Sequence, residues 1–109
     1  MFGFKEKKQE EKSPVVLVLD KLNKLFETLD KDAQDYSLIF MQIEDCDKEI
    51  KKLPPLYRQK VAFSWDGGVI GMLNMIKMQP TQTFPIVWKT GIYLTGFKTN
   101  ILNTINALM

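Results

Sequence analysis

The stretch LYRQKVAFSWDGGVIGMLNMIKM, residues 56–78, decides the fold of this chain. Apolar side chains recur in it at steps of four, four, four, three and four residues, at Tyr57, Val61, Trp65, Val69, Met72 and Ile76. This is the spacing of one face of an α-helix, so the sequence predicts a central helix over residues 56–78.

Glycines lie in the middle of this predicted helix, at Gly67, Gly68 and Gly71. Each glycine costs roughly 1 kcal/mol relative to alanine in a helix interior. A close approach by another backbone or by a ligand is the usual compensation. Methionine suits adaptable binding surfaces, although plain core packing explains the nearby methionines equally well. We therefore predict an interface on this helix made of Trp65, Gly68, Gly71, Met72 and Met75.

Three further helices are predicted around the central one. Ser13-Pro14 is a helix-start signal, and an apolar period of 3.6 residues follows it, which predicts a helix over residues 14–30. A second helix is predicted over residues 33–53, ended by Pro54-Pro55. The last is predicted over residues 85–108, although its part over 84–97 also fits a β-hairpin around Gly91. Four helices with short connections predict an all-α four-helix bundle.

Residues 1–13 read as a polar N-terminal arm in front of a single helical domain over residues 14–109. The arm contains the mixed-charge run KEKKQEEK and too few apolar residues for a core of its own. Two aromatic residues, Phe2 and Phe4, stand near its tip. We expect these two side chains to dock onto a neighbouring subunit or another partner.

The composition of the 109-residue chain is that of an ordinary globular domain, with 45% hydrophobic and 26% charged residues. It has no run of about 18 apolar residues and no signal-peptide pattern, so we expect neither a membrane-spanning helix nor a secretion signal. A single cysteine, Cys46, favours a reducing compartment such as the cytoplasm. The alternative location is as part of an assembled particle.

The residues needed for common catalytic and metal sites are missing. The chain has no histidine, which excludes Ser-His-Asp and Cys-His catalysis and most zinc sites. Cys46 lies among acidic residues, which raise the pKa of a thiol and make it a poor nucleophile. The acidic segment 30–35 lacks the glycine and glutamate that a calcium-binding EF-hand loop requires. We predict no catalytic residue, no metal ligand and no cofactor.

Charge is unevenly distributed along the chain. Residues 1–53 carry a net charge of −2, whereas residues 54–109 carry +4. Burial of much of the second half explains its scarcity of charges, but a mildly basic surface for a polyanion is an alternative. The residues of that alternative contact surface are Arg58, Lys60, Trp88, Lys89, Tyr93 and Lys98.

These observations favour a non-enzymatic protein–protein interaction subunit that forms a homo-oligomer or joins other protein subunits. Small size and high lysine, isoleucine and asparagine content suit a structural or accessory protein of a virus or mobile element. A nucleic-acid-binding bundle that uses the basic second half is one alternative. Another is a helical sponge for a small anionic, nucleotide-like ligand, held at Gly67-Gly68 with help from Arg58 or Lys60.

Overall fold

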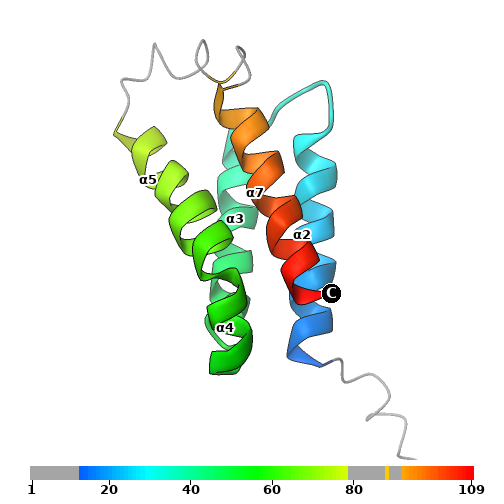
Figure 1. Ribbon diagram of the computed structural model, residues 1–109. Coiled ribbons are helices and arrows are strands. Elements are labelled where there is room, and N and C mark those ends of the chain that lie inside the picture. Colours follow the sequence, from blue (N-terminus) through cyan, green and yellow to red (C-terminus); the bar gives the residue numbers. More distant parts are fainter. Residues whose placement is uncertain (1–12, 79–87, 89–91) are drawn as a thin grey trace, which may run out of the picture.

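The computed structural model describes residues 13–78, 88 and 92–109, and within these ranges it contains helices and no strand. The elements are α2 (Pro14–Leu29), α3 (Tyr36–Ile50), α4 (Pro55–Val61), the π-helical segment η1 (Ala62–Ile70), α5 (Gly71–Lys77) and α7 (Ile92–Leu108). Because α4, η1 and α5 follow one another without a break, they form one long helix, which we call the central helix. The described residues form the predicted all-α bundle of four helices (Figure 1).

Helix α2 starts as its sequence predicts. The Ser13 hydroxyl accepts a hydrogen bond from the backbone N–H of Val16 at 3.2 Å, and Pro14 occupies the first helical position. The helix ends at Leu29, one residue before the predicted end.

Helix α3 is shorter than predicted at both ends. It begins at Tyr36 because the N-cap is Asp35, whose carboxylate accepts from the backbone N–H of Leu38 at 3.1 Å. It ends at Ile50, and residues 51–53 form a tight turn in which Leu53 N–H donates to the carbonyl of Ile50 at 3.0 Å. The residue before a proline is disfavoured in α-helical geometry, and Leu53 precedes Pro54.

The central helix covers nearly the predicted range, but its middle is not α-helical. Over Ala62–Ile70 the backbone is π-helical, a geometry with i→i+5 hydrogen bonds and about 4.4 residues per turn. Residues four apart therefore stay close to one face. The side chains that use this face, each four residues from the next, are all buried: Val61, Trp65, Val69 and Leu73.

The described part of the last segment is helical, which favours the helix over the hairpin for residues 92–97. Helix α7 runs over Ile92–Leu108, and Trp88 is also helical. The remaining residues of the predicted start, 85–87 and 89–91, lie outside the described residues, as does the N-terminal arm up to residue 12.

One apolar core joins all four helices. Helix α2 contacts both α3 and α7, while α7 also packs along α4 and η1, as Figure 1 shows. The largest fully buried side chains in this core are Trp65, Trp88 and Phe97. The indole N–H of Trp65 donates to Asp47 of α3 at 3.0 Å, so its burial leaves no polar atom unpaired.

Candidate functional sites

The central helix and α7 meet along a seam of three residue pairs, spaced four residues apart on both helices. At one end the Ser64 and Thr104 hydroxyls are buried and 2.8 Å apart. In the middle Asn100 lies over Gly68, where an added Cβ would come within 2.6 Å of the Asn100 side chain. At the other end Met72 lies over Gly96, where an added Cβ would likewise come within 2.6 Å of the Met72 methyl group. The antiparallel pairing is consistent throughout, so small residues on each helix receive larger ones from the other.

This seam accounts for residues that the sequence analysis assigned to a partner interface. The close approach expected at Gly68 exists, but α7 of the same chain makes it. Met72 packs into the seam, where its sulfur lies 3.5 Å from the side-chain nitrogen of Asn100. Trp65 is fully buried in the core. Gly68, Met72 and Trp65 therefore pack inside the folded chain, while Phe2 and Phe4 lie outside the described residues.

The opposite side of the central helix carries the predicted interface residues that remain accessible. Phe63, Gly67, Gly71 and Met75 follow one another at four-residue steps, and we call them the outer stripe. With about 4.4 residues per turn in the π segment and 3.6 in α5, they fall within about 50° of one another around the helix axis. The Phe63 side chain is 90% exposed and Met75 is 54% exposed. An added Cβ at Gly67 or Gly71 would meet only backbone oxygens of this helix, at 3.9 and 3.8 Å.

Phe63 is the surface residue that the sequence analysis missed. It lies two residues from both Val61 and Trp65, which places it off the apolar period of the helix. An aromatic side chain on the polar side of an amphipathic helix is the signal that could have identified it. Leu56, 62% exposed, extends the apolar surface toward the start of α4.

The structure describes five of the six residues of the alternative basic surface, all but Lys89. The Arg58 guanidinium is paired with Asp66 at 3.1 Å, and Lys60 lies over the Tyr57 ring, 5.4 Å from its centroid. Lys98 is on α7, paired with Asp30 at 2.8 Å. The rings that would stack on bases are buried, namely Trp88 and Tyr93, and Lys89 lies outside the described residues. The Gly67-Gly68 gap proposed for an anion is occupied at Gly68 by Asn100.

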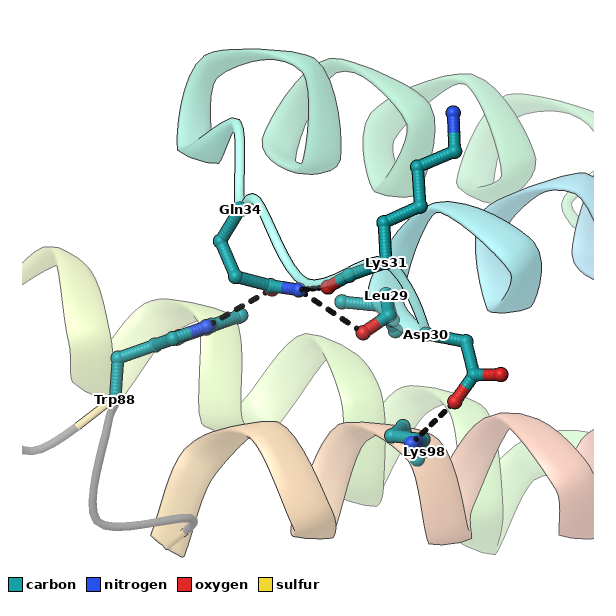
Figure 2. Close-up of polar contacts among 6 residues, drawn as sticks. All are labelled: Leu29, Asp30, Lys31, Gln34, Trp88 and Lys98. Carbon is teal, nitrogen blue, oxygen red and sulfur yellow. Dashed lines mark hydrogen bonds and ion pairs between the residues drawn. The ribbon is translucent and has the colours of Figure 1, made fainter.

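A cavity of about 490 Å³ lies where α2 passes into the turn before α3, and we call it the turn cavity. Its lining residues are Leu29, Asp30, Lys31, Asp32, Gln34, Tyr36, Trp88, Leu94 and Lys98. Figure 2 shows its polar wall, in which Gln34 Nε2 donates to the carbonyls of Lys31 at 2.6 Å and Leu29 at 3.1 Å. The Gln34 Oε1 atom accepts from Trp88 Nε1 at 3.1 Å. The Gln34 side chain thus connects the end of α2 to Trp88, which is 54 residues further along the chain.

The single cysteine is placed as a core residue. Cys46 is buried in α3, and burial, followed by the charge of Asp45, raises the pKa of its thiol to about 12. A thiol in this state is protonated at neutral pH and is a poor nucleophile. Within the described ranges, no three His, Cys, Asp or Glu side chains are grouped so that they could hold a metal ion.

None of the described helices is long and apolar enough to span a bilayer. No protein-family model matches this chain, and comparisons with curated proteins and with solved structures gave no match either.

Proposed function

We propose that this chain is a non-enzymatic protein–protein interaction subunit, and that it binds through the outer stripe of its central helix. The observation that carries this proposal is the 90% exposure of Phe63 in a chain that buries Trp65, Trp88 and Phe97 almost completely. Burying an exposed aromatic side chain in an interface contributes roughly 1.5–3 kcal/mol. Aromatic anchors of this kind are typical of the centre of protein interfaces.

The order of side chains along the stripe favours a second copy as the partner. Phe63, Gly67, Gly71 and Met75 run large, small, small, large, so the pattern is the same in both directions. In an antiparallel copy related by a twofold axis beside Gly67, Phe63 of each chain lies over the bare backbone at Gly71 of the other. Leu56 would extend the buried area at each end.

The alternative of nucleic-acid binding has less support, because Arg58 and Lys98 are already paired and the aromatic rings assigned to that surface are buried. A role in a viral or mobile-element particle stays a prediction from composition. The reducing compartment inferred from the single cysteine also stays a prediction.

Absolute mass in solution tests the proposal, by light scattering on a size-exclusion column over a range of concentrations. The wild-type chain is expected to dimerise as concentration rises, whereas Phe63→Ser and Met75→Ser should shift the chain toward monomer. Met41→Ser is a matched control, because Met41 is 59% exposed on α3, away from the stripe. Circular dichroism verifies that each variant is folded.

Two results would contradict the proposal. A wild-type chain that is monomeric at every concentration would refute self-association. Equal loss of mass in Met75→Ser and Met41→Ser would show that the outer stripe is not the interface. A steep fall of association with salt would instead indicate a charge-driven contact.

A further inference from the structure

The turn cavity is separate from the outer stripe and is not used by the proposed function. Its volume of about 490 Å³ falls in the range of roughly 300–1,000 Å³ that small-molecule sites occupy. It lies where the turn after α2 meets a part of the chain that is distant in sequence, formed by Trp88 and the first turns of α7. Figure 2 shows Trp88 and Gln34 on one side of this region and Lys98 with Asp30 on the other.

One wall of the cavity is held together by hydrogen bonds and ring contacts. The Gln34 amide makes hydrogen bonds to the Leu29 carbonyl, the Lys31 carbonyl and the Trp88 indole, so its orientation is fixed by three contacts. Trp88 is fixed in turn by ring contacts with Tyr36 and Phe97, whose centroids lie 5.5 and 5.6 Å away.

The opposite rim carries one positive and one negative group side by side. Lys98 Nζ lies 2.8 Å from Asp30 Oδ1, and both side chains are partly exposed. The ammonium has three donors and uses one on Asp30. The second carboxylate oxygen, Asp30 Oδ2, has no hydrogen-bond partner among the described residues. This rim can therefore receive an anion at Lys98 and a cation at Asp30 at the same time.

Apolar side chains and a second pair of charged residues, Lys31 and Asp32, complete the lining. Leu29 and Leu94 face the cavity together with the aromatic rings of Tyr36 and Trp88. A site that combines an apolar interior with a neighbouring pair of opposite charges is complementary to a zwitterion with an apolar body. We propose that the turn cavity binds a free α-amino acid with an apolar side chain. Its carboxylate pairs with Lys98, its ammonium with Asp30, and its side chain packs against Leu94 and Tyr36.

The experiment uses the full-length chain, with L-leucine and L-phenylalanine as probes and isothermal titration calorimetry as the readout. Trp88 lines the cavity and supplies a second readout, because its fluorescence should change as either amino acid binds. Three analogues dissect the recognition: glycine lacks the apolar body, 4-methylpentanoate lacks the ammonium, and 3-methylbutylamine lacks the carboxylate. Each should bind at least tenfold more weakly than L-leucine.

Lys98→Met and Asp30→Asn should each weaken L-leucine binding at least tenfold while the chain stays folded. Lys21→Met is the matched control, since Lys21 forms a comparable surface pair with Asp45 at 2.7 Å, away from the cavity. This control should leave the affinity unchanged. Absence of binding by both amino acids would overturn the proposal. Equal binding of 4-methylpentanoate and L-leucine would also overturn it, because the site would then recognise only an anion.

Discussion

Deletion of Gly67 should convert the π-helical segment into an ordinary α-helix without disturbing the core. From Val61 to Leu73 the central helix advances twelve residues, which in an α-helix of 3.6 residues per turn would place the two side chains about 120° apart. The π segment removes this mismatch, because all four buried residues on this face point into the core. With one residue deleted, the same interval is eleven residues, and Leu73 falls within about 20° of Val61 in a plain α-helix.

The expected energetic change is small for the same reason. Gly67 is exposed, and an added Cβ there would meet only the Ala62 oxygen at 3.9 Å, so its removal breaks no side-chain contact. Loss of one glycine from a helix interior is worth about 1 kcal/mol relative to alanine. The free energy of unfolding should therefore stay the same or rise by about 1 kcal/mol. If the deletion instead rotated Val69 and Leu73 out of the core, the loss would be about 3–6 kcal/mol, at 1.5–3 kcal/mol per side chain.

Urea unfolding followed by circular dichroism and by tryptophan fluorescence separates these outcomes. Gly67→Ala serves as the control, because it removes the glycine but keeps the chain length and the π geometry. The reasoning would be refuted if the deletion variant lost more than about 2 kcal/mol or if Trp65 emission shifted to that of a solvent-exposed indole. Either result would mean that the fold requires the π-helical geometry at Gly67, and that Gly67 is not simply one extra residue in an α-helix.

Four further substitutions test the core and the seam. Gly68→Leu should lower the free energy of unfolding in urea by about 1–3 kcal/mol or more, because its Cβ would lie 2.6 Å from Asn100; unchanged stability would contradict the seam. Thr104→Val should cost about 1–3 kcal/mol, because the buried Ser64 hydroxyl loses its partner, whereas Ser64→Ala should cost less, since Thr104 still donates to the Asn100 carbonyl at 2.9 Å. Cys46 should react with a thiol reagent at pH 8 only on unfolding. Burial raises the pKa of this thiol from 9.0 to about 12, so the folded state favours the protonated thiol. The resulting contribution to the free energy of unfolding is complete below pH 9 and is lost as pH rises toward 12. Cys46→Ala should remove this contribution to the loss of stability at alkaline pH.

The helices could be predicted because local signals and apolar spacing agreed in them. Ser13-Pro14 fixes the start of α2, and the prolines at 54 and 55 fix the junction before the central helix. The start of α3 lies three residues later than predicted, because Asp35 and not an earlier aspartate caps this helix. In the turn before it, the Gln34 side chain donates to the carbonyls of Leu29 and Lys31. Such a contact spans the turn and cannot be read from periodicity alone.

The π segment could have been recognised from the spacing of the central helix. An α-helix alternates steps of three and four residues, and an uninterrupted run of fours from Tyr57 to Val69 is too long for it. The partner of each glycine, by contrast, depends on how α7 lies against the central helix. Small residues at 64 and 68 are mirrored by small residues at 96 and 104, but only the packed structure shows that these two sets face each other.

The two sides of the central helix therefore use glycine differently. On the inner side Gly68 admits Asn100 of the same chain, so a larger side chain there would damage the fold before it could affect any partner. On the outer side Gly67 and Gly71 leave bare backbone next to Phe63, which is 90% exposed. Substitutions at Gly71 discriminate between the two roles, because an added Cβ would meet only the Asp66 oxygen at 3.8 Å. Gly71→Leu should leave the unfolding free energy within about 1 kcal/mol of wild type, because helix propensity offsets the exposed side chain, and it should weaken self-association. A variant that unfolds readily would show that Gly71 belongs to the core, and one that is stable and still dimeric would remove Gly71 from the interface.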